Sequence, residues 1–460
     1  MSFQLQYTSL DEIQSTYDDL QKTFRAGKAR PLAWRQHQLR QLLLMLNENQ
    51  QAIVGALQAD LNKPAAESLL GEVGAGIRTA ERTLARVEEW VKPELVAVDE
   101  WQQSWSPTIN KTPKGVVLII SPWNYPFILN IQPLIGAISA GCPAVLKPSE
   151  ISAHTSALLA DLIHKYLDNS TYRVVNGAVK ETTYLLELKW DHIFYTGNSK
   201  VARIIATAAA KHLTPCTLEL GGKSPVVVDA AHTDLKLAAK RILWGKTTNA
   251  GQICVAPDYI LIPRDAQDAF IEALKEAYST FHPGGALGSD SYGSIVSKGH
   301  YDRLQDLIKR TTAKPVIGGG SDGQRTIEPT VYRDVTQGDA LLEGEIFGPL
   351  LPLVPVDNIQ EAIEFINERS HPLALYVFTD DPEVKQAFVE QTLSGSLVFN
   401  DVFQHLSVGE LPFQGIGESG YGAQHLKYTF DGFTHHRATV DIPFSAEPIL
   451  ARRYPPYQKA

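Results

Sequence analysis

Cysteine, positive charge and long apolar runs are all scarce in this sequence. The three cysteines, at positions 142, 216 and 254, are odd in number and widely spaced, which excludes a disulfide framework and a Cys-x-x-Cys metal site. We therefore expect a reducing compartment, a cytoplasmic protein and no bound metal. The formal net charge of −9 offers no basic face for a nucleic acid, so no nucleic-acid partner is expected.

No apolar run approaches the ~20 residues that a membrane-spanning helix needs, so no transmembrane segment is expected. Residues 1–17 are polar and include Asp11 and Glu12, which fits neither a secretory signal nor an arginine-rich transit peptide. The length of 460 residues, with 44% hydrophobic and 20% charged residues, is typical of a globular protein with two or three domains.

The first half of the chain alternates between helical and strand patterns. Apolar residues recur at spacings of three and four over residues 10–91, which predicts helices. Continuous apolar runs at 115–120 and 144–147 are typical of strands buried on both faces of a parallel sheet. Shorter strands are expected at 172–175 and 191–195. Because helical segments separate these strands, this region predicts a doubly wound α/β unit.

A second series of strands and helices begins after Pro225. The strands expected in it are 226–228, 259–262, 314–317 and 351–354, and the helices are 235–243, 266–281 and 359–368. We therefore expect a second α/β domain from about 221 to 410. Residues 96–112, which are rich in Trp, Gln, Ser and Pro, are expected to form an exposed excursion, such as a hairpin that packs on another subunit.

One cysteine and one carboxylate stand in unusual surroundings. Cys254 lies among small and polar residues in the stretch 247–257, and Glu219 interrupts an apolar segment directly before two glycines. A soft nucleophile and a desolvated carboxylate are the two groups needed for covalent catalysis followed by hydrolysis. Each residue alone has a structural alternative, because cysteine is often a small buried hydrophobe and Glu219 could form a salt bridge near a domain boundary.

Polar residues follow several expected strands at the carboxyl edge of the first sheet, where doubly wound sheets bind ligands. Asn124 follows the first strand, Lys147 and Glu150 the second, and residues 196–199 the last. These residues are therefore candidate ligand contacts, although each charge alone could also be a solvated loop charge.

Two motifs have weak sequence contexts. Residues 415–420, GIGESG, match the dinucleotide fingerprint G-x-G-x-x-G, but they follow no buried strand and precede no crossover helix. We expect a loop that needs positive φ or a close backbone approach instead. The neighbouring His435 and His436 would point to opposite faces of a strand and have no companion ligands, so they do not indicate a metal site.

Together these motifs resemble those of the NAD(P)-dependent aldehyde dehydrogenase superfamily, and the resemblance extends from about residue 10 to Tyr457. The segments 119–126, 147–150 and 453–457 are similar to its class 3 branch, which includes enzymes for fatty, aromatic and long-chain aldehydes. The resemblance implies an aldehyde dehydrogenase-like α/β fold with two doubly wound domains and a small bridging element. Its implied divisions are a cofactor-binding domain at 1–94 and 115–220, a catalytic domain at 221–410, and bridging or oligomerisation segments at 95–114 and 411–460. A homodimer is the class 3 expectation.

By this resemblance, Cys254 attacks the aldehyde carbon, and the Asn124 amide with the Cys254 backbone N–H holds the oxyanion. Glu219 then activates the water that hydrolyses the resulting thioester. The implied reaction oxidises a medium-chain, long-chain or aromatic aldehyde to its carboxylic acid with NAD(P)+. Because a free thiol has a pKa near ~8.5, an electropositive or hydrogen-bonding setting is expected around Cys254.

The resemblance also implies a cofactor site. Lys147 and Glu150 match positions that reach the adenosine ribose, where the Glu150 carboxylate favours NAD and the neighbouring Lys147 leaves the use of NADP open. The other implied cofactor contacts are Trp123, Gly197, Asn198, Leu220, Glu345 and Phe347. Ala202 departs from the family pattern, because glycine is usual at its position beneath the pyrophosphate.

The substrate site is expected to be apolar. The aromatic residues expected to line it are Tyr125, Trp244, Phe403 and Phe413. Gln414 replaces a glycine of the family motif near the expected substrate mouth. The resemblance therefore supports the expected reaction more strongly than the expected substrate. Two alternatives remain: an acylating enzyme that passes the thioester to coenzyme A, and a catalytically idle structural protein on the same fold.

Overall fold

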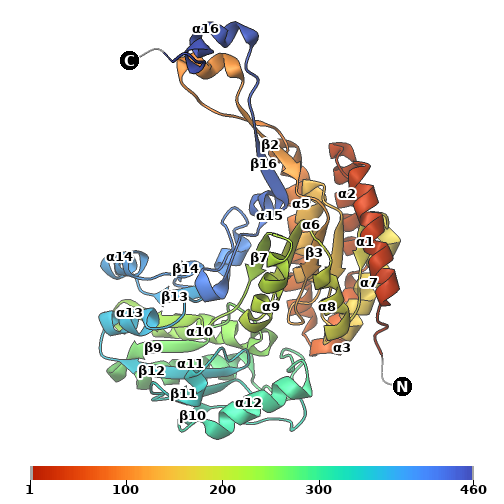
Figure 1. Cartoon of the computed structure of the whole chain (residues 1–460). Helices are drawn as coiled ribbons and strands as arrows, with labels where there is room; N and C mark the ends of the chain where they lie inside the picture. Colours follow the sequence, from red (N-terminus) through yellow and green to blue (C-terminus); the bar gives the residue numbers. More distant parts are fainter. Residues whose placement is uncertain (1–3, 458–460) are drawn as a thin grey trace.

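Three sheets organise the chain, and the computed structural model describes residues 4–457. The first three residues of the expected N-terminal domain and the last three of the expected bridging segment lie outside the described residues. A six-stranded and a seven-stranded sheet form two α/β units, and a three-stranded sheet carries an arm that projects from them (Figure 1). The expected α/β fold with two layered units is confirmed.

The six-stranded sheet has the order β15-β7-β6-β3-β4-β5. Its strands are β3 (Val117–Ile120), β4 (Ala144–Lys147), β5 (Tyr172–Val174), β6 (His192–Thr196), β7 (Cys216–Glu219) and β15 (Gly420–Tyr421). All are parallel except β15, which runs antiparallel to β7. The chain passes from β3 outward to β5 and then returns to the other side of β3 as β6. The strand order therefore reverses between β3 and β6, where open α/β sheets bind ligands.

Helices cover both faces of this sheet. They are α1 (Leu10–Arg25), α2 (Leu32–Glu48), α3 (Gln50–Leu61), α4 (Ala65–Ser68), α5 (Gly74–Trp90), α6 (Ile128–Ala140), α7 (Ala153–Tyr166), α8 (Val179–Glu187) and α9 (Ser199–Ala210). Successive residues of β3 enter two different cores, because Val117 and Ile119 face α2, α6 and α7 whereas Leu118 and Ile120 face α1, α8 and α9. This alternation explains why the strand is apolar at every position.

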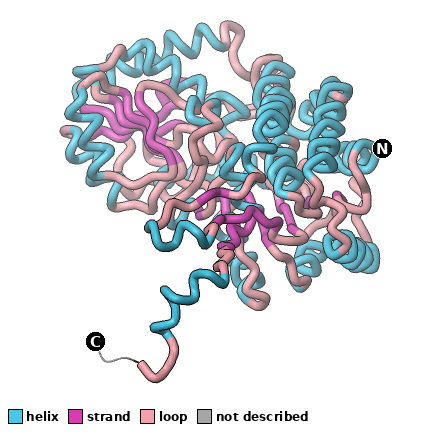
Figure 2. Tube along the Cα trace, turned by 90° about the horizontal axis from the view of Figure 1, so that it is seen from above, coloured by secondary structure: helices cyan, strands magenta, loops and turns pink. Residues whose placement is uncertain are grey.

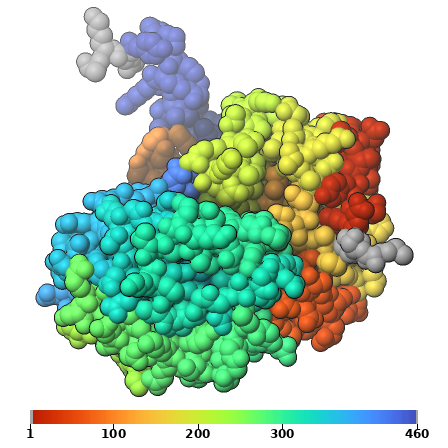
Figure 3. Space-filling view, turned by 90° about the horizontal axis from the view of Figure 1, so that it is seen from below, coloured from red at the N-terminus to blue at the C-terminus, as the bar shows by residue number. Residues whose placement is uncertain are grey.

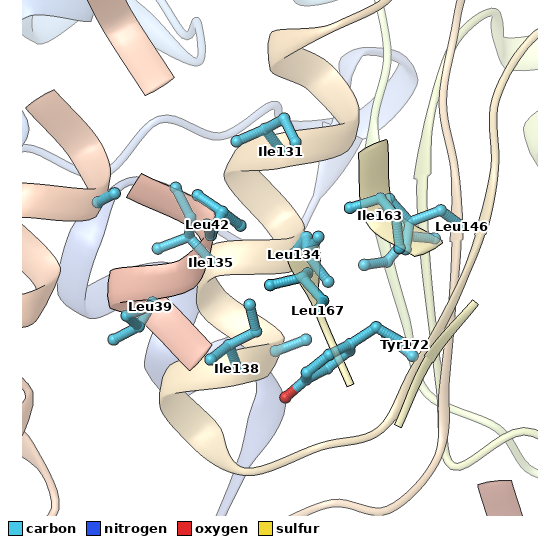
Figure 4. Close-up of a cluster of buried hydrophobic side chains, with 14 of the residues drawn as sticks. Leu39, Leu42, Ile131, Leu134, Ile135, Ile138, Leu146, Ile163, Leu167 and Tyr172 are labelled. Atoms are coloured by element: carbon cyan, nitrogen blue, oxygen red, sulfur yellow. The ribbon is translucent and has the colours of Figure 1, made fainter. Parts of the chain in front are cut away.

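The larger of these two cores lies between α2, α6, α7 and the sheet. Figure 4 shows part of it, with Leu39, Leu42, Ile131, Leu134, Ile135, Ile138, Leu146, Ile163, Leu167 and Tyr172 labelled. The apolar residues of α2 recur at spacings of three and four, so they share one face of the helix, and burial of that face fixes α2 against α6.

The seven-stranded sheet has the order β10-β11-β12-β9-β8-β13-β14. Its strands are β8 (Pro225–Val228), β9 (Tyr259–Pro263), β10 (Lys314–Ile317), β11 (Thr330–Arg333), β12 (Leu350–Val356), β13 (Ala374–Phe378) and β14 (Ser396–Phe399). Only β10 is antiparallel to its neighbour. The helices around it are α10 (Leu235–Thr247), α11 (Gln267–Phe281), α12 (Lys298–Arg310), α13 (Ile359–Asn367) and α14 (Pro382–Gln391). Figure 2 shows these helices around the twisted strands.

Several observed elements were not predicted. Among them are α8, β7, α12, β11, β13, α14 and β14. The helix α12 is strongly polar and buries only Tyr301, Leu304 and Leu307, so its apolar stripe is narrow. The strand β7 reads Cys-Thr-Leu-Glu and ends on a carboxylate, so it lacks the continuous apolar run that marks β3.

The arm begins in the three-stranded sheet of β1 (Glu94–Leu95), β2 (Thr108–Pro113) and β16 (Thr434–Thr439). β1 pairs antiparallel with β2, which confirms the expected hairpin, and β16 pairs with β2 along its whole length. Residues 96–107 and 440–457 extend beyond this sheet and project from the body (Figures 1 and 3). Their chain direction is set by the antiparallel pairing of β2 and β16, because residues 107 and 440 leave the sheet at the same end.

The segment before β16 packs on the first α/β unit, although the sequence placed it with the bridging residues. Here β15 adds an edge to the six-stranded sheet, and α15 (Leu426–Phe433) lies on α5 and α6. Its residues Leu426, Phe430 and Phe433 share one helix face and enter the larger core.

The loop at 415–420 is not a dinucleotide cradle. Gly420 has φ +121°, and a Cβ atom there would lie 1.9 Å from the Leu218 carbonyl oxygen, so only glycine allows the close pairing with β7. This confirms the expectation of a close backbone approach. Among residues 4–457, no helix is both long and apolar enough to cross a membrane.

Candidate active site

A cavity of about 650 Å³ opens at the carboxyl ends of β3, β6 and β7, facing residues of the second unit. This is the reversal point of the six-stranded sheet. Eleven of the residues predicted for catalysis or cofactor binding line it: Trp123, Asn124, Lys147, Glu150, Gly197, Asn198, Glu219, Leu220, Cys254, Glu345 and Phe347. The fold therefore brings together residues that span more than two hundred positions of the sequence.

The loop that carries Cys254 is tightly wound. After α10, Asn249 and Ala250 adopt left-handed φ values of 49° and 51°. Gly251 follows with φ +73°, and a Cβ atom there would lie 2.3 Å from the Gly348 carbonyl oxygen. Glycine is thus needed at position 251 to allow this close backbone contact. Gln252 is fully buried, where its amide donates to Ser294 O (3.1 Å) and its Oε1 accepts from Val296 N (2.9 Å).

The Cys254 thiol is partly buried in the cavity. Burial raises its pKa to about 12, the nearby carboxyl groups of Glu345 and Glu219 add to the rise, and the backbone N–H groups of Cys254 and Val255 oppose it. The expected hydrogen-bonding setting is thus present, but an electropositive one is not, because the charged groups acting on the thiol within residues 4–457 are carboxylates. The thiol is protonated at neutral pH in this environment.

Asn124 lies in the loop between β3 and α6 and is 3% exposed. Its Nδ2 atom donates to the Gln252 carbonyl oxygen at 3.1 Å, which ties it to the loop of Cys254. The backbone carbonyl oxygen of Asn124 accepts hydrogen bonds from Lys63 Nζ at 3.1 Å and from Asn249 Nδ2 at 2.9 Å. The Asn124 amide still has a second N–H group, so it can donate to a ligand in the cavity.

Glu219 ends β7 and is 1% exposed. Neither of its carboxyl oxygens has a hydrogen-bond partner within residues 4–457. Burial therefore holds its pKa well above the usual range. The salt-bridge alternative weighed from the sequence is wrong for the described residues. A buried carboxyl with a raised pKa in the wall of a cavity is a candidate for proton transfer.

Glu345 and Phe347 lie in a loop that enters the cavity from the second unit. Burial raises the pKa of Glu345 to about 8, and the charge of Asp258 contributes to this rise. Phe347 has φ +46°, and its ring meets the ring of Trp123 edge-on with centroids 5.3 Å apart.

An ion pair holds this loop in place. Lys223 Nζ lies 2.7 Å from Asp258 Oδ1 and also donates to the carbonyl oxygens of Leu341 and Gly344 at 2.9 and 3.0 Å. Asp258 Oδ2 accepts from the Ile346 N–H at 3.0 Å. The pair thus grips the backbone on both sides of Glu345.

The cavity is also lined by an ion pair and by the start of a helix. Lys147, buried at the end of β4, lies 3.0 Å from Glu150 Oε2. Asn198 caps α9 by accepting from the Val201 N–H at 2.9 Å, and residues 197 and 198 line the cavity. The first N–H groups of α9 therefore begin beside the cavity, an arrangement suited to an anion such as a phosphate. Ala202 is 2% exposed and packs in the core beneath this turn.

A comparison with known proteins decides the family. The model of the aldehyde dehydrogenase family matches residues 2–439. The chain belongs to the aldehyde dehydrogenase family. It is similar to the dimeric NADP-preferring aldehyde dehydrogenase of Rattus norvegicus, with 44% identity over 449 residues that cover 97% of this chain and 98% of the rat protein. It is also 42% identical to the rat aldehyde dehydrogenase family 3 member A2 over 438 residues, which cover 95% of this chain and 90% of that protein.

Solved structures agree with this assignment. A substrate-bound state of Staphylococcus aureus AldH matches with a TM-score of 0.91 and 38% identity over 93% of each chain. The NADP complex of NADP-dependent glyceraldehyde-3-phosphate dehydrogenase from Bacillus halodurans matches with a TM-score of 0.86 and 25% identity, over 94% of this chain and 91% of that one. The class 3 resemblance is thus confirmed, and the chain is an NAD(P)-dependent aldehyde dehydrogenase that oxidises aldehydes to acids.

The cavity of this aldehyde dehydrogenase has groups that fit a dinucleotide. Lys147 and Glu150 lie at one end of it and Glu345 and Phe347 are further lining residues, with the start of α9 also on the wall. Glu345 Oε1 is buried and has no hydrogen-bond partner within residues 4–457, so it is able to accept a hydrogen bond from a ligand hydroxyl. The residues present therefore match a ligand with a charged middle, a ribose hydroxyl and a flat ring.

The four aromatic residues expected at the substrate pocket do not line the cavity described above. Tyr125 and Phe403 pack with Cys254 against the core of the second unit, of which Phe413 is a member. Trp244 is 40% exposed, and its ring meets that of Phe403 with centroids 5.4 Å apart. Their part in substrate binding stays a prediction.

Several groups around the site were not found from the sequence. Gln252 and Asn249 could have been, because both are polar residues next to the cysteine that drew attention. Lys63 and Glu72 had no such signal, because each is a single charge in the helical N-terminal region. Only the fold reveals that both are buried beside Asn124.

Proposed function

We propose that this aldehyde dehydrogenase converts medium-chain, long-chain or aromatic aldehydes to carboxylic acids through a thioester on Cys254 that Glu219 helps to hydrolyse. The observation that carries the proposal is the shared cavity, which Cys254 and Glu219 both line, with a Glu219 carboxyl that has no hydrogen-bond partner within residues 4–457. A nucleophile and a buried base in the wall of one cavity suit covalent catalysis followed by attack of water.

In the first step, Cys254 Sγ forms a bond to the aldehyde carbon, and the carbonyl oxygen gains negative charge. The free N–H of the Asn124 amide and the Cys254 backbone N–H are the donors that hold this oxyanion. Removal of one such donor costs about 10²–10³-fold in rate in a well-studied protease. The thiol must first lose its proton, because burial raises its pKa to about 12.

Bound NAD(P)+ supplies the hydride acceptor and a positive charge that favours the thiolate. The chain's own residues hold that ligand. Glu345 would accept a hydrogen bond from a ribose hydroxyl, Phe347 would pack against the ring, and the start of α9 would hold the pyrophosphate. At the adenosine end, Glu150 disfavours a 2′-phosphate, but the Lys147 ammonium at 3.0 Å offsets its charge, so NAD is favoured and NADP is also used.

In the second step, the carbon bonded to Sγ loses its hydrogen as a hydride, which bound NAD(P)+ would accept, and its C–O bond becomes a carbonyl. Water then attacks the resulting thioester on Cys254. Glu219 takes one proton from this water, and the bond between carbon and Sγ breaks to release the acid and the thiolate. Glu219 lies in the wall of the cavity, next to the space that this water would occupy. Transfer of the acyl group to coenzyme A would make this base unnecessary.

The aldehyde chain enters from the side of Tyr125, Phe403, Phe413 and Trp244. Three of these side chains pack at the core that also contacts Cys254, and the edge of Trp244 is exposed to solvent beside Phe403. Apolar side chains on this side of Cys254 suit an aliphatic or aromatic substituent rather than a charged one.

We also infer a homodimer built through the arm. Phe444 is 100% exposed and Leu95 is 86% exposed, so both present apolar surface that a second copy can cover. The rat relative is named dimeric, which supports this inference.

The test is an assay of the purified chain with NAD or NADP and a panel of aldehydes of increasing length and aromatic character. NADH formation that rises with apolar length, without coenzyme A, is the expected result. Cys254→Ala should abolish it, whereas Cys216→Ala should not. Cys216 is the matched control, because it is also partly buried, its pKa is also raised to about 11, and it lies outside the cavity lining. Full activity in Cys254→Ala, or strict dependence on coenzyme A, would refute the mechanism.

A further inference from the structure

Behind the cavity lies a buried ion pair between Lys63 and Glu72. Both side chains are 0% exposed, and Lys63 Nζ donates to Glu72 Oε1 over a short contact. Burial of two charges costs free energy that their attraction often fails to recover, so such a pair is weak grounds for stability alone. The other contacts of the pair indicate a role in positioning.

Glu72 fixes the start of α6. It lies in η1 (Leu69–Val73), a π-helical turn between α4 and α5. Its second oxygen, Oε2, accepts from the N–H groups of Phe127 and Ile128 at 2.9 and 3.2 Å. These are the first backbone donors of α6, which have no partner within their own helix. A carboxylate at this end also complements the helix dipole.

Lys63 fixes the other end of the same loop. Its ammonium group donates to the Asn124 carbonyl oxygen at 3.1 Å and lies 3.8 Å from the centre of the Tyr125 ring. The pair therefore holds the loop between β3 and α6 by hydrogen bonds at two points, with Lys63 bonded to Asn124 and Glu72 bonded to Phe127. The π-helical turn brings the Glu72 carboxylate to this position, and such turns recur at functional sites.

The loop between β3 and α6 is in turn hydrogen-bonded to the loop that carries Cys254. Asn249 Nδ2 donates to the Asn124 carbonyl oxygen at 2.9 Å and to the Gln252 carbonyl oxygen at 3.1 Å. Asn124 Nδ2 donates to the same Gln252 oxygen at 3.1 Å. The orientation of the Asn124 amide thus depends on the peptide that Lys63 holds.

We propose that Lys63, held by Glu72, is a positioning residue that fixes the Asn124 amide relative to the Cys254 loop. This inference rests on the proposed role of Asn124 as an oxyanion donor. The oxyanion forms during the reaction and not on binding of the aldehyde. Loss of the Lys63–Glu72 pair therefore lowers kcat and leaves the KM for aldehyde nearly unchanged. Most of the expected cofactor contacts, among them Lys147, Glu150 and the start of α9, lie on other elements, so binding of NAD is expected to change less than kcat.

The test variant is Lys63→Met combined with Glu72→Gln. Lys63→Met alone would leave Glu72 buried without its partner and could unfold the chain. The double variant removes both charges, keeps the volume of each side chain, and retains a glutamine oxygen that can accept from the start of α6. The expected result is a fall in kcat of about 10–100-fold, less than the full loss of one oxyanion donor.

A matched control separates positioning from stability. Arg35→Met removes another buried cation, one that donates to the carbonyl oxygens of Ala29, Arg30 and Ser139 at the far end of α6. This variant is expected to lower the melting temperature and to keep the wild-type kcat. If the double variant and Arg35→Met lose kcat alike, loss of stability and not positioning explains the effect, and the proposal fails.

A cycle with Asn124→Ala decides whether Lys63 acts through Asn124. If it does, adding Lys63→Met and Glu72→Gln to Asn124→Ala changes kcat by less than about 2-fold, because the coupled effects are not additive. Multiplicative losses, or a wild-type kcat in the folded double variant, would overturn the inference while Asn124→Ala remains slow. If instead Asn124→Ala is as fast as wild type, the proposed oxyanion role fails and this inference falls with it.

Discussion

Replacing Glu219 by glutamine separates the two halves of the proposed reaction. The substitution changes little else, because neither carboxyl oxygen of Glu219 has a partner within residues 4–457. Glutamine has the same shape and lacks the ability to accept a proton from water. We expect Glu219→Gln to form the thioester on Cys254 and then to hydrolyse it slowly.

The size of the effect follows from the role of a general base. Such a base contributes about 10²–10⁴-fold, which corresponds to about 3–5 kcal/mol of activation free energy. Steady-state turnover of Glu219→Gln should fall by this factor. The first turnover should persist, so rapid mixing with aldehyde and NAD should give a stoichiometric burst of NADH before the slow phase.

The same variant has a predicted effect on stability. The pKa of Glu219 in the fold lies well above its ordinary value of 4.5 because of burial. A carboxyl with a raised folded pKa binds its proton more tightly in the fold, so wild-type stability is lost as the pH rises from the unfolded pKa towards the folded one. Glu219→Gln lacks this loss. It should therefore melt at a higher temperature than wild type at pH 7 and at the same temperature below pH 4.

Two results would refute this reasoning. One is a Glu219→Gln variant that turns over at the wild-type rate, because another group would then activate the water. The other is a variant without any burst, because Glu219 would then be needed before the thioester forms. Glu418→Gln is a matched control, since it changes an exposed carboxylate that pairs with Arg203 away from the cavity lining, and it should leave both phases unchanged.

Further outcomes follow from the same site. The kcat/KM should rise with pH above 7, because burial raises the pKa of Cys254 to about 12 and the thiolate fraction grows with pH; a flat profile would contradict this. Glu150→Gln should improve the ratio of kcat/KM for NADP over NAD by about 10-fold, since one like charge near the 2′-phosphate is removed, and an unchanged ratio would exclude that contact. Phe444→Asp should shift the dimer to a monomer in light scattering, and an unchanged mass would place the interface elsewhere. Lys63→Met with Glu72→Gln should lower kcat as described above.

The sequence is most informative where chemistry and chain order coincide. Buried parallel strands are marked by continuous apolar runs, and polar residues just after them must lie at one edge of the sheet. This pattern alone predicts that Asn124, Lys147 and Glu150 lie near one another, and all three line the same cavity. Cys254 and Glu219 needed the family resemblance as well, because each alone had a structural alternative.

The remaining features depend on contacts between distant segments. The charge of Lys63 resembles that of any helix-end lysine until the fold buries it beside Asn124. The sequence places the helix α15 in the bridging segment. Its apolar residues find their partners on α5 and α6, which are far away in sequence and cannot be predicted from the local pattern. Of the electropositive or hydrogen-bonding setting expected around Cys254, only the hydrogen-bonding part is present within residues 4–457, and the carboxyls that raise the pKa of the thiol come from β7 and the loop of Glu345.

The covalent link between Cys254 and the acyl group is open to direct measurement. Glu219→Gln is mixed with NAD and an aromatic aldehyde, quenched in acid during the slow phase, digested and analysed by mass spectrometry. The peptide that contains Cys254 should gain the mass of the acyl group, and the peptides of Cys142 and Cys216 should not. NADH production without any acyl mass on Cys254 would contradict the proposed mechanism.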